Sequence, residues 1–296
     1  MSGLSVVIPN RDGGALLERC LEALAAAERV HEVIVVDDGS RDGSPERASE
    51  LGAQLSRSPG RGFAAAVNHG VSRARGEHVL ILNSDAFVEP GTPRRLAEAL
   101  DRHPELALVG GGLVDALGAR TRSHGHDLKL VRALGLSLHL STPPPPEHGQ
   151  LQPVAFVPLA CAAVRRSAYT AVDGLDERFH FYFEDHDLCW RLRRAGWTVA
   201  VRWDARALHE GGGSSRAHGA APWMRQFHES RLRYVRKRYP LLWPAYLTVS
   251  VPSLLAHAAL WLARALRSAA GGDRAGTARD RAWAAAYLRA ALAGAR

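Results

Sequence analysis

The sequence predicts an α/β fold, in which a doubly wound, mainly parallel sheet of Rossmann-like type is followed by a helical C-terminal extension. Up to residue 112, short runs rich in β-branched residues alternate with helical segments. This alternation is typical of parallel strands joined by crossover helices. With 296 residues and 46% hydrophobic content, the chain can bury one large core and a smaller one beside it.

Each strand and helix of this fold can be placed from local patterns. Strands are predicted at residues 5–9, 32–37, 53–57, 78–83 and 106–111, and strand-like patterning returns at 154–165. Helices are predicted at residues 15–28, 45–51, 63–73 and 93–103, because Gly, Ser, Thr or Pro introduces each of them. Residues 114–150 lose this periodicity and form an irregular excursion without an assigned role. Further helices are expected at 223–239, 241–262 and 273–292, the last amphipathic and facing solvent.

Charge and cysteine content narrow the class of protein. The net charge of +8 allows nucleic acid, an anionic membrane surface or a phosphorylated substrate as partner. Nucleic acid is not expected, because the basic residues concentrate in one C-terminal helix without aromatic platforms or a recognisable motif. Cys20, Cys161 and Cys189 form no CxxC pair, which favours a reduced cytosolic setting. The N-terminus also lacks the pattern of a secretory signal, so we expect an intracellular protein.

Polar residues gather where three of the predicted strands end. In open parallel sheets, ligands bind beyond the carboxyl ends of the strands, where the strand order reverses. Converging carboxylates and amides at that edge suit a nucleotide together with Mg²⁺ or Mn²⁺, since hard oxygen ligands favour these cations. The candidate residues are Pro9, Asn10 and Arg11, then Asp37, Asp38 and Gly39, and then Asn83, Ser84 and Asp85.

Two of these positions have specific expected contacts. Asp37 and Asp38 can accept hydrogen bonds from a base or a ribose, although a polar turn is the alternative. Asp85 ends the apolar run 79–82, where its carboxylate could hold a divalent cation that bridges two phosphates and neutralises the charge growing on the diphosphate. A helix cap or turn is the alternative there as well.

A glycine-rich segment at residues 60–65 defines a competing function. Its sequence Gly-Arg-Gly-Phe-Ala-Ala fits the GxGxxA fingerprint of an NAD(P)-dependent oxidoreductase. That fingerprint normally opens the first strand–helix turn, whereas two strand–helix units precede it here. We therefore expect Gly62 and Phe63 to allow close backbone packing beside a bound nucleotide, with Asn68 on the following helix.

A second chemical cluster mixes acidic and aromatic residues. Glu184, Asp185 and Asp187 stand close in sequence to Tyr182 and Trp190. Such neighbours can exclude water and raise the pKa of a carboxyl group, as a general base requires. The alternative is that acids in a first helical turn stabilise the helix dipole.

One histidine is a candidate metal ligand. His209 precedes a glycine run at 211–213, and a neutral imidazole there could complete a site begun by Asp85. One histidine among 14 is more often a surface residue, so this assignment depends on the other motifs.

Taken together, these motifs resemble those of family 2 glycosyltransferases, in particular their bacterial rhamnosyltransferase-like branch. Order and spacing are both kept between residues 5 and 239. The shared segments are Val-Val-Ile-Pro-Asn, Val-Val-Asp-Asp-Gly-Ser, Gly-Phe-Ala, Leu-Asn-Ser-Asp, Gly-Leu-Asp-Glu-Arg-Phe, Glu-Asp-x-Asp-Leu-Cys-x-Arg and His-Glu-Gly-Gly.

The resemblance implies a GT-A fold and an inverting transfer from a nucleotide diphosphate sugar to a glycan or lipid-linked acceptor. It places Asp37 and Asp38 at the nucleoside, Asp85 and His209 at the metal, and Asp185 as the base. The presence of both Asp185 and His209 argues against a catalytically silent nucleotide-binding module. The branch points to dTDP-rhamnose, while the residues themselves fix neither sugar nor base.

The same resemblance sets the expected domains and the acceptor contacts. Residues 1–239 would form the catalytic domain, with a nucleotide-binding half at 1–112 and an acceptor half at 113–239. Residues 240–296 would form the helical extension. Tyr182, Glu184 and Trp190 are expected at the acceptor.

Three positions depart from the family pattern. Arg11 stands where an aromatic residue is usual, Asp12 where Asn is frequent, and Gly60 where Asn usually precedes the Gly-Phe-Ala step. Because a guanidinium group can stack on a base, donor binding is still expected at Arg11. Asn83 replaces the first Asp of a DxD motif, which leaves Asp85 as the main acidic ligand.

The stretch 241–262 could contact a membrane. It is long enough to span a bilayer, but Pro244, Pro252 and His257 interrupt it. We expect a surface-lying anchor at the inner face of the cell membrane; packing on the catalytic domain or in a homodimer is the alternative. The flanking basic residues are Arg231, Arg233, Arg236, Lys237, Arg238, Arg264 and Arg267.

Overall fold

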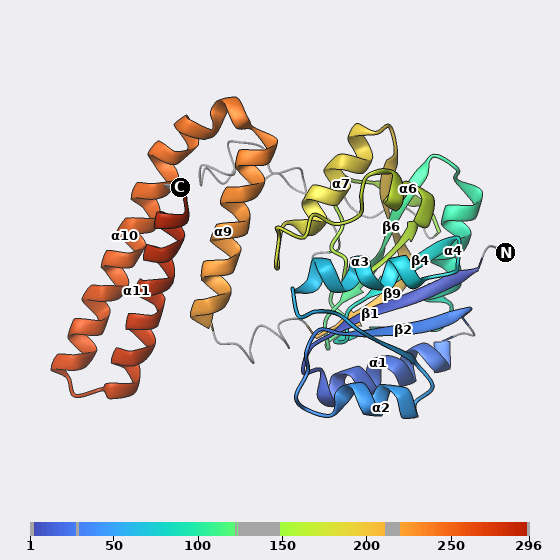
Figure 1. Ribbon diagram of the computed structural model, residues 1–296, viewed down its shortest axis with the longest axis horizontal. Helices are drawn as coiled ribbons and strands as arrows, with labels where there is room; N and C mark the ends of the chain where they lie inside the picture. Colours follow the sequence, from blue (N-terminus) through green and yellow to red (C-terminus); the bar gives the residue numbers. More distant parts are fainter. Residues whose placement is uncertain (1–2, 28–29, 122, 124–148, 211–219, 295–296) are drawn as a thin grey trace. The chain divides into compact units, whose positions relative to one another are not determined.

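The computed structural model describes residues 3–27, 30–121, 123, 149–210 and 220–294. The chain divides into two compact units (Figure 1). The first comprises Met1–Asp127, Ser141–His180 and Glu184–Ser214, and the second comprises Leu128–Leu140, Phe181–Phe183 and Ser215–Arg296. The irregular excursion expected at 114–150 lies largely outside the described residues, as does the glycine run at 211–213.

The first unit is built on one mixed sheet. Among the described residues its strand order is β3-β2-β1-β4-β8-β6-β9-β5, with β7 paired to β9. The strands are β1 (Leu4–Asn10), β2 (Glu32–Asp37), β3 (Gln54–Arg57), β4 (His78–Leu82), β5 (Ala86–Val88), β6 (Leu106–Val114), β7 (Leu151–Pro153), β8 (Cys161–Arg165) and β9 (Thr198–His209). Neighbours from β3 to β4 pair in parallel, as predicted, while β8, β5 and β7 are antiparallel to their partners.

Helices cover both faces of this sheet. One face carries α1 (Gly14–Ala27), α2 (Ser44–Glu50) and α4 (Thr92–Arg102), and the other carries α3 (Phe63–Arg73), α6 (Arg166–Ala171) and α7 (Glu184–Arg194). Successive side chains of a strand point to opposite faces. Accordingly, Val6 and Ile8 of β1 join the core under α1, whereas Val7 joins the core under α3. This two-sided burial explains why β1 is buried throughout and mostly apolar.

The predicted elements agree with the structure except in the second half of the sheet. The helix expected at 63–73 has those limits as α3, whereas only 161–165 of the strand-like stretch 154–165 forms a strand. The long strand β9 was not predicted, because charged residues interrupt its apolar pattern. Two of them neutralise each other, since Nε of Arg202 lies 3.0 Å from Oδ1 of Asp204.

The second unit is a group of helices with its own core. It contains α9 (Ala220–Arg238), the short helix η1 (Pro240–Leu242), α10 (Trp243–Ala270) and α11 (Arg274–Gly294). The boundary between the units therefore falls before α9, whereas the sequence placed it after residue 239. The expectation that the last helix faces solvent is wrong for one side of it. Ala286, Tyr287, Ala290 and Ala291 of α11 are buried in this core with Leu232 and Tyr246.

Candidate functional site

The two residues expected at a metal are in contact. Nε2 of His209 lies 3.2 Å from Oδ1 of Asp85, and their side chains are 22% and 12% exposed, which leaves both open to a ligand. Asp85 lies in the turn between β4 and β5, immediately before Ala86, and His209 is the last residue of β9. The carboxylate and the imidazole therefore meet at the carboxyl end of a central strand.

The strand register explains this contact. Ala86 begins β5 and pairs with His209 in the antiparallel ladder between β5 and β9. The backbone N–H of Glu210 donates to the carbonyl of Asp85 at 3.1 Å, which extends the ladder by one step. Backbone pairing, rather than the side chains alone, holds the imidazole next to the carboxylate.

The donor set at this position fits a divalent cation bound together with a diphosphate. No cluster of three or more His, Cys, Asp and Glu side chains able to hold a metal occurs in the part of the chain that the structure describes. Mg²⁺ commonly takes one or two protein ligands and completes its shell with substrate phosphates and water. Asn83 also offers a buried amide oxygen that has no hydrogen-bond partner among the described residues. One carboxylate, one imidazole and a nearby amide oxygen therefore suit a metal ion that binds together with a diphosphate-containing ligand.

A further pair of residues, not found by sequence reasoning, holds this end of β9. Nη1 of Arg19, on α1, lies 2.6 Å from Oε1 of Glu210. The Arg19 guanidinium also lies over the Phe87 ring, 4.3 Å from its centroid. Arg19 thus contacts both β5 and the residue that follows His209.

The carboxylates at the end of β2 lie at the same edge of the sheet. Asp37 is 3% exposed, and its Oδ1 accepts a hydrogen bond from the backbone N–H of Ser40 at 3.0 Å. Asp38 is 5% exposed, and its Oδ2 accepts from the N–H of Gly62 at 2.9 Å. The Oδ1 atom of Asp38 is buried without a partner among the described residues. A buried carboxylate oxygen of this kind normally requires a donor, which a ribose or base would supply.

The loop after β1 is tied to the loop after β2. The Nδ2 atom of Asn10 donates to the hydroxyls of Ser40 at 3.2 Å and Ser44 at 2.9 Å. Oδ1 of Asp12 accepts from the N–H of Arg41 at 2.7 Å. Asn10 is buried and therefore shapes the loop, whereas Arg11 is exposed beside it. Neither serine was a candidate, although turn-forming Ser residues after a strand could have indicated them.

The glycine-rich segment makes a close backbone approach, as expected. Gly62 has φ of +98°, and a Cβ there would lie 2.8 Å from the carbonyl oxygen of His180. The N–H of Phe63 donates to that same carbonyl at 3.2 Å. Because the N–H of Gly62 also donates to Asp38, the segment links the end of β2 to the loop before α7.

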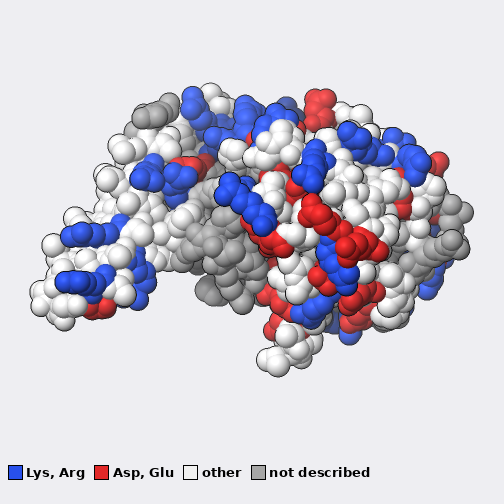
Figure 2. Space-filling model, turned by 60° about the horizontal axis from the view of Figure 1, so that its bottom comes forward, with Lys and Arg blue, Asp and Glu red and all other residues white. Residues whose placement is uncertain are grey.

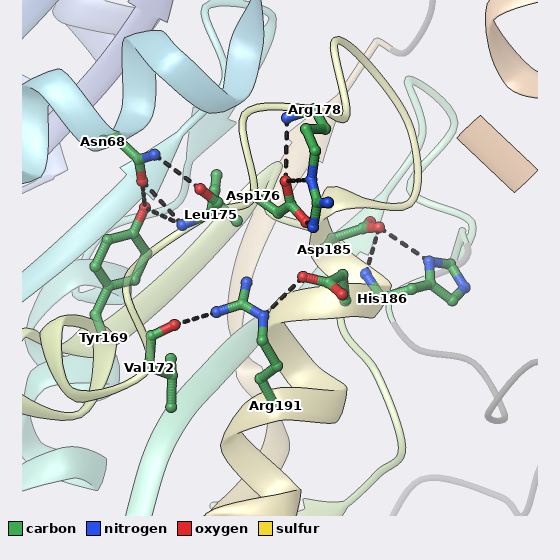
Figure 3. A network of polar contacts seen from close by, with 10 residues as sticks. Asn68, Tyr169, Val172, Leu175, Asp176, Arg178, Asp185, His186 and Arg191 are labelled. Atoms are coloured by element: carbon green, nitrogen blue, oxygen red, sulfur yellow. Dashed lines mark hydrogen bonds and ion pairs between the residues drawn. The ribbon is translucent and has the colours of Figure 1, made fainter. Parts of the chain in front are cut away.

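Asn68 lies on α3, the helix that follows the glycine-rich segment, as expected. Its Nδ2 donates to the carbonyl of Leu175 at 2.8 Å and to Glu177 at 3.1 Å, and its Oδ1 accepts from Leu175 N–H at 2.9 Å. The Tyr169 hydroxyl donates to the same Oδ1 at 2.5 Å (Figure 3). The amide is thus fully used in fixing the loop that precedes α7.

Asp185 stands in the first turn of α7. Its Oδ1 accepts hydrogen bonds from the backbone N–H of His186 at 2.7 Å and from Nδ1 of that ring at 2.9 Å. The His186 ring stacks on Phe156 with centroids 3.7 Å apart. The side chain of Asp185 is 17% exposed, so its carboxylate is oriented by the imidazole and is still accessible.

Glu184 and Asp187, the acidic residues closest to Asp185 in the sequence, have environments that differ from that of Asp185. Burial, and secondarily the negative charge of Asp185, raises the pKa of Glu184 well above its ordinary value. Asp187 is ion-paired to Arg191 at 2.7 Å, and Arg191 also donates to the carbonyl of Val172 (Figure 3). The expected rise in pKa therefore applies to Glu184, while Arg191, paired with Asp187 on the same helix, ties α7 to its preceding loop.

The two aromatic residues expected at the acceptor fall in different units. Tyr182 belongs to the second unit, where Trp223 donates to its hydroxyl and Phe227 packs on its ring. Trp190 lies on α7, partly exposed, with Arg194 over its ring at 5.6 Å. Tyr182 also has φ of +70°, an uncommon backbone conformation for a non-glycine residue.

Comparison with known sequences identifies a family. The sequence model of the family described as "Glycosyl transferase family 2" matches residues 5–172. An N-acetylglucosaminyl-diphospho-decaprenol L-rhamnosyltransferase from Mycobacterium tuberculosis is 29% identical over 285 residues, which cover 86% of this chain and 90% of that protein. A pre-mycofactocin glycosyltransferase from the same organism is 35% identical over 217 residues, or 69% of this chain and 42% of the relative.

Two solved structures that share this fold can be compared with the chain. The mannosyltransferase PcManGT from Pyrobaculum calidifontis, in complex with GDP-Man and Mn²⁺, has a TM-score of 0.57 and 19% identity, covering 98% of this chain and 86% of its own. GalNAc-T7 with UDP, GalNAc and Mn²⁺ has a TM-score of 0.60 and 14% identity, covering 80% of this chain and 48% of its own. These likenesses confirm the predicted GT-A fold.

Proposed function

The chain belongs to glycosyltransferase family 2, and on that premise we propose that it is an inverting, divalent-metal-dependent hexosyltransferase. Its donor is a nucleotide diphosphate sugar, and its acceptor is a hydroxyl of a glycan or of a lipid-linked sugar. The similarity to an L-rhamnosyltransferase supports rhamnose as the transferred sugar. The family match includes residues 60–65, which removes the basis for the alternative oxidoreductase assignment.

The contact between Asp85 and His209 carries this proposal. Together they supply one carboxylate and one imidazole at the carboxyl end of β4, 3.2 Å apart. A Mg²⁺ or Mn²⁺ ion held there would neutralise the charge of the departing diphosphate. Asn83 and Ser84 would line the same turn, and the amide oxygen of Asn83 has no other partner among the described residues.

The nucleoside half of the donor would lie along the loops after β1 and β2. The unpartnered Oδ1 atom of Asp38 supports a hydrogen bond to the ribose or base. Pro9 and Asn10 shape the adjoining loop, and the exposed Arg11 can stack on the base. We assign Asn68 to positioning the 172–178 loop instead of donor contact, because its amide is already bonded there.

Asp185 would act as the general base. As the acceptor oxygen attacks the anomeric carbon, its proton passes to the Asp185 carboxylate. One carbon–oxygen bond forms while the bond to the diphosphate breaks, and the nucleoside diphosphate leaves. A single displacement of this kind inverts the anomeric centre without a covalent enzyme intermediate. The hydrogen bond from His186 would orient the base.

The acceptor is proposed to be lipid-linked and presented at the inner face of the cell membrane. The name of the M. tuberculosis relative describes transfer onto a sugar carried on diphospho-decaprenol. Glu184 and Trp190, both on α7 of the first unit, are the proposed acceptor contacts. A cytoplasmic site is consistent with three cysteines that are all free and buried.

The test is a screen of nucleotide diphosphate sugars by thermal shift with and without Mn²⁺. A ligand that binds only the folded state at 100 times its Kd stabilises that state by about 2.7 kcal/mol. We expect stabilisation by one donor class that depends on Mn²⁺, followed by NMR detection of inverted product on a synthetic lipid-linked acceptor. Retention of anomeric configuration, or stabilisation by NADH instead of any nucleotide sugar, would contradict the proposal.

A further inference from the structure

Helix α10 buries one side and exposes an apolar one. Tyr246, Ser250, Leu254 and Ala265 are buried in the core of the helical unit. The opposite side carries large apolar side chains that are 44–64% exposed, an arrangement uncommon in a helix of a soluble protein. We call this the outer face of α10: Val249, Leu255, Leu260, Leu262 and Leu266, with the exposed small residues Pro252, Ala256, Ala259 and Ala263 between them.

The charge around this face is mainly positive, with Asp273, just beyond the end of α10, as an exception. No Asp or Glu occurs from residue 230 to residue 272. Arg264 and Arg267 stand at the C-terminal end of α10, and the end of α9 supplies Arg236, Lys237 and Arg238. Figure 2 shows this helical part as white surface with blue patches and little red. An apolar strip bordered mainly by cations is complementary to an anionic lipid surface.

Length and hydropathy alone would also allow α10 to cross a bilayer. Pro240–Ala270 has a window of mean hydropathy 1.4 with 17% of it buried. However, α10 packs along α11, whose sequence carries Arg274, Arg279, Asp280, Arg281 and Arg289. Asp280 is 1% exposed, 3.0 Å from Arg279 and 3.9 Å from Arg264. A crossing α10 would either draw these charges into hydrocarbon or lose its partner helix, and both are costly.

We propose that the outer face of α10 lies in the plane of an anionic bilayer, with its leucines among the lipid chains and its flanking arginines at the phosphate groups. The paired helix α11 stays on the aqueous side and covers the buried face of α10. This inference rests on the proposed lipid-linked acceptor, because such an acceptor requires the enzyme to work at a membrane. To the proposed function it adds which surface of the protein contacts the membrane, how α10 is oriented there and that the lipids are anionic.

The test is co-sedimentation of the full chain with vesicles of phosphatidylcholine alone or with added phosphatidylglycerol. The test variant carries Leu262→Gln and Leu266→Gln, which are 51% and 63% exposed. The matched control carries Leu288→Gln and Leu292→Gln on α11, which are 46% and 56% exposed. Since apolar burial drives insertion, we expect the α10 pair to weaken vesicle binding by about tenfold or more and the α11 pair to leave it unchanged.

Salt and lipid composition provide the second criterion. Binding should require phosphatidylglycerol and should fall as NaCl is raised, because screening weakens attraction between exposed charges. Equal binding to neutral vesicles, equal loss in both variant pairs, or resistance to carbonate extraction would overturn the inference. So would an α10 variant that changes only a monomer–dimer equilibrium in light scattering. Donor stabilisation in the thermal-shift screen is measured without vesicles, so failure here leaves the proposed transfer separately testable.

Discussion

The imidazole of His209 and the carboxylate of Asp85 lie 3.2 Å apart because Ala86, next to Asp85, is paired with His209 across β5 and β9. The short strand β5 thus has a direct consequence for the site. A substitution that weakens the pairing of β5 with β9 should lower metal affinity at the proposed site more than it lowers the stability of the rest of the fold.

Arg19→Gln should weaken Mn²⁺ binding without abolishing it. The residue contacts Glu210 at 2.6 Å and Phe87 at 4.3 Å, and Glu210 is bonded through its backbone to Asp85. Exposed ion pairs contribute at most about 1 kcal/mol, so the loss in affinity should not exceed about fivefold. Titration of Mn²⁺ by electron paramagnetic resonance measures it directly.

Arg47→Gln is the matched control for this variant. The side chain of Arg47 is 48% exposed and that of Arg19 is 53% exposed. Arg47 pairs with Glu18 on α1 and with Glu50 on α2. Its loss should leave Mn²⁺ affinity unchanged. Equal effects of the two substitutions would mean that the Arg19 contact has no specific role in positioning His209.

Asp185→Asn should abolish transfer while donor binding is kept. The amide keeps the size of the side chain but cannot accept a proton, and general-base catalysis typically contributes about 10²- to 10⁴-fold. We therefore expect kcat to fall by about that factor, with an unchanged donor-dependent thermal shift. Wild-type turnover in this variant would show that another group takes the proton.

Asn68→Ala should lower stability and impair acceptor-side kinetics, with donor affinity kept. Its amide bonds to Tyr169, Leu175 and Glu177, and removing one partner of a buried polar group typically costs about 1–3 kcal/mol. Ser72→Ala, an exposed change on the same helix, should have little effect. If Asn68→Ala instead raised the donor Kd and left acceptor KM unchanged, the originally predicted donor contact would be correct.

Glu184→Gln should stabilise the protein increasingly as pH rises. Burial raises the pKa of this carboxyl in the folded state, so the folded protein holds its proton more tightly than the unfolded chain. Its favourable contribution is complete below the unfolded pKa and is lost as pH rises through the folded pKa. The neutral amide removes that loss, and each kcal/mol regained should raise Tm by about 2–4 °C. Melting curves from pH 5 to 8 would show a widening gap, and a constant gap would contradict this.

Local patterns were sufficient for the first half of the sheet. The central residues of runs such as 5–9 and 32–37 lie in a sheet covered on both faces, so their apolar character is nearly continuous and easily recognised. The strand β9 was missed because Arg202, Asp204 and Arg206 break its pattern. In the fold Asp204 pairs with Arg202 and also lies 3.8 Å from Arg95 of α4, a tertiary contact that local patterns do not reveal.

The candidate site was predictable as a set of residues but not as a set of contacts. Strand ends and motif order indicated Asp38, Asp85 and His209. The Arg19–Glu210 ion pair depends on the strand register, which the sequence does not reveal. The contacts of Asn68 could not be predicted either, because Leu175 comes next to it only in the folded chain.

The most direct test of the account is Mn²⁺ affinity in wild type, Asp85→Ala and His209→Ala, each measured with UDP and with dTDP present. His103→Ala serves as the control. His103 is exposed, and among the described residues its only ion pair is with Glu105. Loss of either protein ligand should weaken Mn²⁺ binding by tenfold or more, which corresponds to about 1.4 kcal/mol. The control should match wild type. Wild-type affinity in both Asp85→Ala and His209→Ala would contradict the proposed metal site.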